Sequence, residues 1–212
     1  MDPTADLDGP ALDFANCTYT VKVKQKGATG KSPRKLIANV SASIPSGVVL
    51  AVMGPSGAGK TTLLDMLMLE RCGGVPEGVV TLGGHRLTLD LYMKHCAVVT
   101  QHDCLWWSLT VAEHISIALA LYQPELTTSE RIAYLDKLVD DVGLRSCMHI
   151  KAGNALFKGL SGGQMRRLSV AKQLLGEPSL LLLDEPTSGL DSASALAVMR
   201  DLRSVARRDG CT

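Results

Sequence analysis

Residues 54–61 read GPSGAGKT, a glycine-rich loop that ends in lysine and threonine. Glycines let a chain turn so tightly that successive backbone amides converge on a phosphate group, with no Cβ in the way. Lys60 would bring a positive charge to the β- and γ-phosphates of a nucleotide, and the Thr61 hydroxyl can ligate Mg²⁺. The apolar residues 48–53 before the loop and the leucines at helical spacing after it supply the strand and helix that such a loop requires. We therefore expect phosphate contacts from Gly54, Pro55, Ser56, Gly57, Ala58, Gly59, Lys60, Thr61 and Thr62.

A second apolar run, residues 180–183, ends in two acids, Asp184 and Glu185. Open α/β sheets bind ligands at the carboxyl ends of their strands, so these acids are expected beside the phosphate loop. Asp184 would hold Mg²⁺, and Glu185 would orient the attacking water and help to deprotonate it. By itself the pair could simply begin a surface loop, but together with the phosphate loop it indicates a hydrolytic site.

The third motif, LSGGQ at residues 160–164, precedes Met165, Arg166 and Arg167 in a helix that we expect to carry a basic face. Its start would present unpaired backbone amides, which makes a second anion site. One chain does not need two separate binding sites for one triphosphate, whereas a second site can bind the nucleotide held by another copy of the chain. The pattern predicts one subunit of a two-fold dimer, in which the second phosphate-binding site is made by Ser161, Gly162, Gly163 and Gln164.

The composition limits the other possibilities. In 212 residues, 22 Lys and Arg balance 21 Asp and Glu, so no bulk charge favours a nucleic-acid partner. Hydrophobic residues make up 46%, which is enough for one large domain with a substantial core. The apolar runs are too short to cross a membrane. The six cysteines form no CxxC pair, so we expect reduced, mostly buried thiols and no zinc site.

Hydrophobic periodicity predicts the elements that hold these motifs. Strands are expected at residues 12–23, 36–44, 48–53, 79–82, 96–100 and 180–184, with a loop at 27–33. Helices are expected from Lys60 to about Cys72, at 110–122, at 128–142 and at 193–208. Two of them begin with a capping box, Thr110 to Glu113 and Thr127 to Glu130.

With these motifs in this order, the chain resembles the nucleotide-binding domain of an ABC (ATP-binding cassette) transporter over essentially its whole length. Gln101 in VVTQHD is similar to the Q-loop of that family, and SGLD at residues 188–191 is similar to its D-loop. The resemblance implies an α/β P-loop NTPase fold: a RecA-like core with an antiparallel β subdomain and an inserted α-helical subdomain. Within the domain 1–212, residues 1–101 and 165–212 would form the core lobe and 102–164 the helical signature lobe.

The resemblance also implies roles for single residues. Glu185, Lys60 and Gln101 would be catalytic, and Thr61, Gln101 and Asp184 would hold Mg²⁺ beside ATP. Asp191 would reach the phosphate loop of the other subunit, cap the following helix, or do both.

For three aromatic residues, the sequence leaves two possible roles open. Alignment puts Val21 where relatives stack the adenine, so Tyr19 could take that role from the same strand face or be a core residue. Trp106 and Trp107 could face a membrane-domain partner or pack inside the domain.

Several segments resemble the G subfamily, the white-type half-transporters: residues 53–67, 98–121 and 183–196. One departure is SGGQ at residues 161–164, where most of that subfamily has SGGE. The resemblance implies export of a lipid-like or other amphipathic substrate. It also implies a second nucleotide-binding domain as partner, in a homo- or heterodimer. A transmembrane domain is expected C-terminal in the same full-length chain, with this domain on the cytoplasmic face of the membrane.

The family also carries a switch histidine beyond the D-loop helix. The histidines here, at 85, 95, 102, 114 and 149, all precede Asp184. The chain is therefore expected to be a fragment that binds ATP better than it hydrolyses it. The alternatives are a soluble ABC ATPase of translation or DNA maintenance, disfavoured by the lack of heptads or a second cassette, and a P-loop kinase, disfavoured by LSGGQ.

Overall fold

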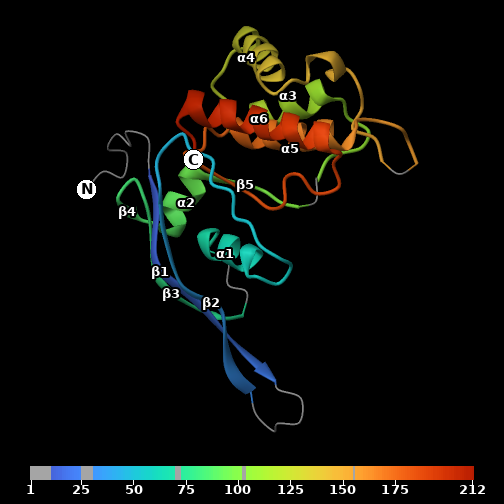
Figure 1. Ribbon diagram of the computed structural model, residues 1–212. Helices are drawn as coiled ribbons and strands as arrows, with labels where there is room; N and C mark the ends of the chain where they lie inside the picture. Colours follow the sequence, from blue (N-terminus) through green and yellow to red (C-terminus); the bar gives the residue numbers. More distant parts are fainter. Residues whose placement is uncertain (1–10, 25–30, 70–72, 102–103, 155) are drawn as a thin grey trace.

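The computed structural model describes residues 11–24, 31–69, 73–101, 104–154 and 156–212, which form a mixed α/β structure. The strands are β1 (Leu12–Lys24), β2 (Lys31–Ile44), β3 (Val75–Leu82), β4 (His85–Arg86), β5 (Cys96–Val99) and β6 (Leu180–Leu183). The helices are α1 (Lys60–Leu67), α2 (Leu89–His95), α3 (Val111–Tyr122), α4 (Thr128–Asp141), the 3-10 turn η1 (Arg145–Cys147), α5 (Gly162–Leu174) and α6 (Ser192–Asp209). Figure 1 shows α3 to α6 grouped at one end of the molecule and the long β1–β2 ribbon extending at the other.

The antiparallel sheet has the strand order β2-β1-β3-β4. Its main ribbon runs from the pair Leu12–Ile44 to the pair Lys24–Lys31, so residues 31–33, expected in a loop, are part of β2. Pro33 is tolerated there because β2 is an edge strand, where the missing N–H leaves no neighbour unpaired. The rest of the expected loop, residues 27–30, lies outside the described residues.

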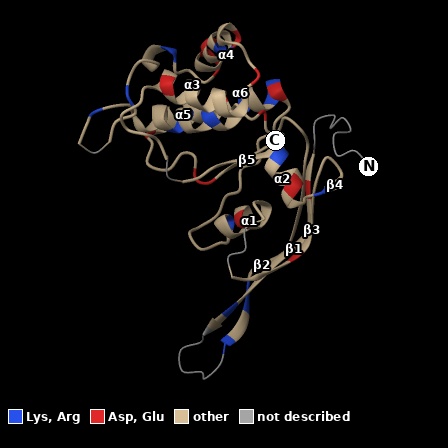
Figure 2. Cartoon of the chain, turned by 180° about the vertical axis from the view of Figure 1, so that it is seen from behind, with Lys and Arg blue, Asp and Glu red and all other residues tan. Residues whose placement is uncertain are grey.

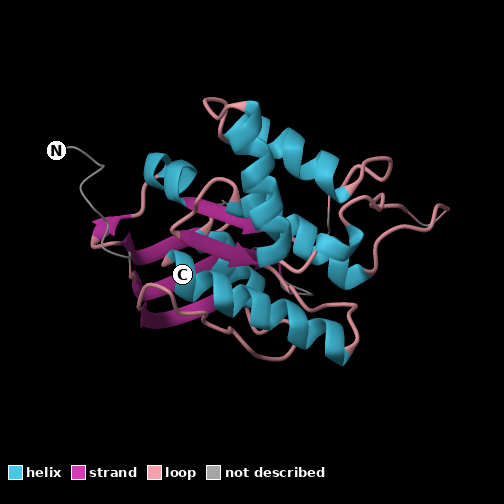
Figure 3. Ribbon diagram, turned by 90° about the horizontal axis from the view of Figure 1, so that it is seen from above, coloured by secondary structure: helices cyan, strands magenta, loops and turns pink. Residues whose placement is uncertain are grey.

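The strands β5 and β6 form a parallel pair, in which β6 is mostly buried, as its apolar sequence predicts, and β5 is mostly half-buried. Alternate residues enter two hydrophobic cores. Leu181 packs with the helices α3 to α6, whereas Leu180 and Leu182 pack beneath the antiparallel sheet with α1 and α2. Seen from above, the strands gather on one side and the larger helices extend away from them (Figure 3). The carboxyl ends of β5 and β6 thus emerge together where the two cores meet.

The expected strand at residues 48–53 is wrong: this segment forms no strand and pairs with none among the described residues. Leu50 is 50% exposed and Met53 89% exposed, so the segment is not covered on both faces. It lies along a cavity of about 500 Å³ that β6 also lines. An apolar run becomes a strand only when neighbouring strands take up its backbone hydrogen bonds, and none does so here.

The helix predictions hold at α3 and α4, where Thr110 with Glu113 and Thr127 with Glu130 form complete capping boxes. Helix α2 was not expected from the sequence. It spans seven residues and is held by a cap, because the Thr88 side chain accepts a hydrogen bond from the Leu91 amide. Figure 2 shows acidic and basic residues on the same helix in both α2 and α4.

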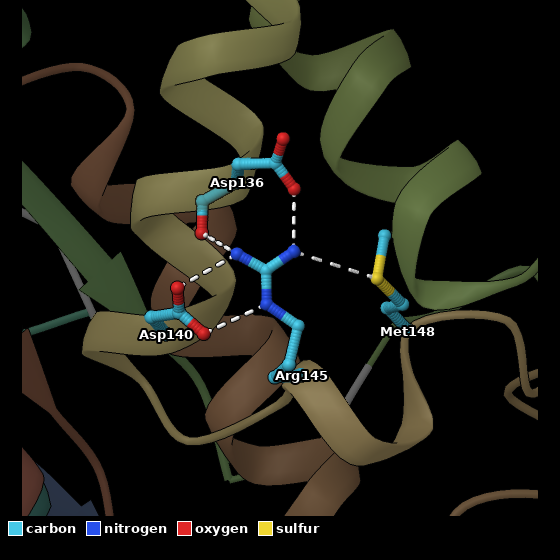
Figure 4. Close-up of polar contacts among 4 residues, drawn as sticks. All are labelled: Asp136, Asp140, Arg145 and Met148. Atoms are coloured by element: carbon cyan, nitrogen blue, oxygen red, sulfur yellow. Dashed lines mark hydrogen bonds and ion pairs between the residues drawn. The ribbon is translucent and has the colours of Figure 1, made fainter.

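Arg145 in η1 closes the turn after α4, as Figure 4 shows. Its guanidinium donates two hydrogen bonds of 2.7 Å to the carboxylate of Asp140 and one of 2.6 Å to the backbone oxygen of Asp136. It also forms an ion pair with the Asp136 carboxylate. These bonds hold the pKa of Asp140 below its ordinary value.

The described cysteines form no disulfide with one another, and Cys17, Cys147 and Cys211 are buried as expected. Cys104 is exposed and Cys96 is half-buried, and Cys72 lies outside the described residues. Among the described helices, none combines the length and the apolar character that crossing a membrane requires.

Candidate functional site

The phosphate loop leads into α1, which starts differently from the other described α-helices. Helices α2 to α6 each begin with a side chain that caps a first-turn amide, but α1 begins at Gly59 without such a cap. Gly59 has φ 95°, and a Cβ there would lie 2.9 Å from the backbone oxygen of Leu36. Glycine is therefore required both by the backbone angle and by the close packing. The uncapped helix start leaves amides that can bind an anion.

Lys60, the first residue of α1, turns back over the loop. Its ammonium donates hydrogen bonds of 3.0 Å to the Gly54 oxygen and 3.1 Å to the Pro55 oxygen. The loop and Lys60 thus form a compact cradle, with Thr61 exposed beside it. A phosphate would offer the ammonium a charged acceptor in place of two neutral carbonyls, which is the stronger bond.

The acidic pair shares a cavity with the lysine. Lys60, Asp184 and Glu185 all line the 500 Å³ cavity between α1 and β6. The backbone N–H of Asp184 donates to Val99 in β5 over 3.0 Å, which fixes where the acids leave the sheet. The fold therefore brings together the lysine and the two carboxylates, which are separated by more than a hundred residues in the sequence.

Burial raises the pKa of Asp184, and the nearby charges of Glu185 and Asp65 raise it further. The positive charges of Arg166 and Lys60 act in the opposite direction. Nearby acids destabilise the ionised form of this carboxylate, and a bound cation would stabilise it.

Gln101 and Glu185 are in direct contact. The Gln101 side-chain amide donates a hydrogen bond of 2.9 Å to Oε2 of Glu185. Both side chains are exposed at the carboxyl ends of β5 and β6. The side chain expected to bind Mg²⁺ thus also orients the side chain expected to act as general base.

Glu185 has φ 46°, a left-handed conformation that a residue other than glycine rarely adopts. Such strain costs on the order of 1–3 kcal/mol and persists only where the surroundings hold the backbone in place.

Arg166 was not expected at the site. It was expected on the basic face of an amphipathic helix, but it is buried, with 3% exposure. Its guanidinium donates to backbone oxygens of Thr100, Gln101 and Glu185, at 2.6, 3.0 and 3.3 Å. The sequence does not show which of the neighbouring arginines, Arg166 or Arg167, points inward. That depends on how α5 packs against the ends of β5 and β6.

The signature residues form the start of α5. Ser161 accepts a hydrogen bond from the Gln164 amide, and the Gln164 side chain accepts one from the Ser161 amide, so the two residues make a capping box. The glycines allow α5 to approach the D-loop, because a Cβ on Gly162 would lie 3.1 Å from Leu190 and one on Gly163 would lie 3.2 Å from Ser194. The capping box satisfies the amides of Ser161 and Gln164, so only those of the two glycines suit a second anion.

Asp191 caps α6. Its carboxylate accepts hydrogen bonds from the amides of Ala193 and Ser194 and from the Ser194 hydroxyl, which lower its pKa. The expected capping role is confirmed. The reach of Asp191 toward another subunit stays a prediction.

Tyr19 is a core residue: it is 1% exposed, and its hydroxyl accepts a hydrogen bond of 3.0 Å from the Gly74 amide. It cannot stack on an adenine from that position. The half-buried Val21 packs against the same core.

Trp106 and Trp107 are 61% and 49% exposed, so neither is a buried core residue, and a contact with a membrane domain stays a prediction. Trp107 stacks on Phe157, and Trp106 stacks on the buried His114. The His114 ring accepts a hydrogen bond from the Trp106 amide and contacts the Thr110 oxygen, and burial lowers its pKa.

The donors in the site fit a magnesium–nucleotide complex. The hydroxyl of Thr61, the carboxylate of Asp184 and the amide oxygen of Gln101 are hard oxygen ligands, which Mg²⁺ prefers. The uncapped start of α1 and the Lys60 ammonium supply the donors for phosphate oxygens.

Comparison with known proteins agrees with this chemistry. The family model described as ABC transporter matches residues 37–188. ABC transporter G family member 1 of Dictyostelium discoideum is 37% identical over 92% of this chain and 25% of its own length. Members 21 and 13 of the same family in Arabidopsis thaliana are 39% and 43% identical, over 98% and 85% of this chain and 34% and 26% of their own lengths. The chain thus spans about a quarter to a third of the length of these curated relatives. The chain belongs to the ABC transporter family of ATPases, and its relatives place it nearest the G family within it.

Proposed function

We propose that the chain binds MgATP and hydrolyses it at an interface between two copies, to drive transport across a membrane. The observation that carries the proposal is the cavity on which Lys60, Asp184 and Glu185 converge, with Gln101 bonded to Glu185. A structural role would not require three charged groups and an ordered amide at one strand edge.

In this proposal each residue has one task. Glu185 accepts a proton from the attacking water while Gln101 holds its carboxylate in place. The water oxygen forms a bond to the γ-phosphorus, and the bond from that phosphorus to the β–γ bridging oxygen breaks, which releases ADP. Mg²⁺, when bound to Thr61, Gln101 and Asp184, would neutralise negative charge on the phosphates. Lys60 and the loop amides stabilise the same charge, which is most of what phosphoryl transfer needs from a protein.

The second subunit would supply the start of α5. Ser161 and the amides of Gly162 and Gly163 would bind the γ-phosphate held by the other copy, with Asp191 near the opposite loop. In this arrangement residues 1–101 and 165–212 act as the core lobe and 102–164 as an inserted helical lobe.

The membrane role follows from the relatives, whose names identify them as ABC transporters of the G family. We propose export of a lipid-like or amphipathic substrate, driven from the cytoplasmic face through a transmembrane domain that follows in the same polypeptide. These relatives do not favour the alternative of a soluble ATPase of translation or DNA maintenance.

The first test is nucleotide binding by Lys60→Met, measured with a fluorescent ATP analogue in the presence of Mg²⁺. Losing a charge-assisted bond to phosphate should weaken binding about 10- to 100-fold. Lys94→Met is the matched control, because Lys94 is exposed on α2 and pairs with Asp90 in an (i, i+4) ion pair away from the phosphate loop. Equal affinities for the two variants would refute the assigned cradle.

Glu185→Gln separates binding from chemistry. It should bind MgATP like the unmodified chain but hydrolyse it about 10²- to 10⁴-fold more slowly, because the amide cannot take the proton. Unchanged hydrolysis would exclude Glu185 as the base.

A further inference from the structure

We propose that Arg166 is a positioning residue that sets the spacing and orientation of Gln101 and Glu185 for hydrolysis, without touching the nucleotide. This inference rests on the proposed ATPase function. It assigns a task to a buried arginine that the roles given above leave unexplained.

The first support is the set of bonds that Arg166 makes. The side chain comes from α5, and its acceptors belong to two other segments: Thr100 and Gln101 after β5, and Glu185 after β6. Two guanidinium nitrogens serve all three carbonyls: Nη1 donates to Thr100, and Nη2 donates to both Gln101 and Glu185. One rigid, planar group thus fixes the backbone at both residues of the Gln101–Glu185 hydrogen bond.

The second support is the backbone of Glu185. Its left-handed conformation, φ 46°, needs external support, and its carbonyl receives two donors, Arg166 and the Ser188 amide. If Arg166 is removed, one of these two restraints is lost. Glu185 is then free to relax toward an ordinary conformation, which turns its carboxylate away from Gln101.

The third support is the place of Arg166 in α5. The same helix begins with the signature residue Ser161 and carries Arg166 at 3% exposure to the ends of β5 and β6. Burying a charged side chain costs free energy unless it is well bonded, so a purely structural contact here would be better served by an apolar residue. Arg166 therefore gives α5 a rigid connection between the signature and the groups that handle the attacking water.

The test compares Arg166→Lys and Arg166→Met with Arg167→Met in the 212-residue chain. Arg167 is the next residue of the same helix, and it pairs with Asp201 of α6 at 3.0 Å instead of with the site. Both Arg166 variants should hydrolyse ATP about 100-fold more slowly, since small displacements of reacting groups have effects of that size. Their affinity for MgATP should stay within about twofold of the original, and Arg167→Met should lower the melting temperature but keep its turnover.

Chemical rescue distinguishes positioning from stability. Arg166→Ala leaves room for a free guanidinium ion, which can bond to the same three carbonyls. Added guanidinium, far below denaturing concentrations, should raise turnover of Arg166→Ala and leave Arg167→Met unchanged. If the Arg166 and Arg167 variants lose turnover in proportion to their loss of melting temperature, with no rescue, the positioning role is overturned.

Amide hydrogen exchange tests whether Arg166 positions Gln101 and Glu185 without any measurement of ATP hydrolysis. Arg166→Met should speed exchange at residues 100–101 and 185–188 and leave α3 and α4 unchanged. Unchanged exchange at both segments would overturn the proposal. Failure of the proposed function looks different, because in that case the unmodified chain itself does not bind MgATP.

Discussion

At the scale of single residues, Asp184 and Glu185 are neighbours in the chain but have different surroundings. Glu185 is exposed and bonded to Gln101, whereas Asp184 is half-buried beside two other acids. The raised pKa of Asp184 means that its ionised form is disfavoured in the folded chain, so at neutral pH it reduces stability. This destabilisation is the electrostatic condition for binding a cation.

Asp184→Asn should therefore make the chain without ligand more stable and impair its function. We expect the melting temperature at pH 7 to rise by about 1–3 °C, because the substitution removes a partly buried charge and its repulsion from Glu185 and Asp65. The gain should vanish as the pH falls through the raised pKa, where Asp184 is already protonated. The added stabilisation by MgATP should disappear at the same time.

Differential scanning fluorimetry with and without MgATP measures both effects. Asp90→Asn serves as the control, because Asp90 is exposed on α2 and pairs with Lys94. A fall in the melting temperature of Asp184→Asn without ligand would contradict the electrostatic account.

Residue types and spacing were sufficient to predict that Lys60, Asp184 and Glu185 lie close together, because each follows directly from a motif that carries its own strand or helix. Arg166 could not be predicted in this way. Its role depends on three carbonyls from β5 and β6 that meet only in the folded chain. The burial of Tyr19 could not be predicted either, because strand alternation places it on one face of the strand but does not say which face is buried.

At the scale of elements, local signals predicted α3 and α4 well because a capping box is complete within four residues of sequence. The strand expected at 48–53 failed because a strand depends on partners elsewhere in the chain. Helix α2 was missed since seven residues with one cap give too little periodicity. Sequence patterns therefore predict a helix whose capping box and periodicity are both complete, but they do not say whether an apolar run such as residues 48–53 finds a strand partner.

The turn that follows α4 offers a prediction about stability. Arg145→Gln should lower the melting temperature at pH 7 by about 2–4 °C, because it removes the bidentate bond to Asp140 and the bond to the Asp136 oxygen. The pKa of Asp140 is lowered by Arg145, so the stabilisation is present above the unfolded value of about 3.9 and is lost as the pH falls below it.

Thermal melts at pH 7 and pH 3 measure this difference. Lys137→Gln is the control, because it removes one positive charge from an exposed position of α4, the helix before the turn. The gap between Arg145→Gln and the original chain should narrow from pH 7 to pH 3, where only the pH-independent bond to the Asp136 oxygen is fully kept. A gap of equal size at both pH values would show that the ion pair is not its cause.

At the scale of the whole molecule, the site lies where two hydrophobic cores meet. The alternation along β6 sends Leu181 into one core and Leu180 and Leu182 into the other, and Asp184 and Glu185 follow directly. Helix α5 begins at the signature and belongs to the first core, whereas α1, which follows the phosphate loop, belongs to the second. A change in how the two cores pack would therefore alter the distance between the phosphate loop and the start of α5.

If two copies share each nucleotide, two inactive variants should restore activity when mixed. Lys60→Met disables the phosphate loop, and Ser161→Asp places a negative charge where the partner's γ-phosphate would lie. Asp is itself a good N-cap, so Ser161→Asp should keep α5 folded. In a mixed dimer, the loop of the Ser161→Asp subunit and the signature of the Lys60→Met subunit make one intact site.

Random pairing of equal amounts should recover about a quarter of the original ATPase rate, since half of the dimers are mixed and each has one intact site of two. Thr127→Asp, the same kind of cap change at α4, should keep full activity by itself and so shows that the substitution is harmless to a helix. A mixture as inactive as its components, while MgATP still dimerises the original chain, would mean that each subunit binds its phosphate alone. Recovery on mixing requires a phosphate held from both sides, because neither variant contains a complete set of donors.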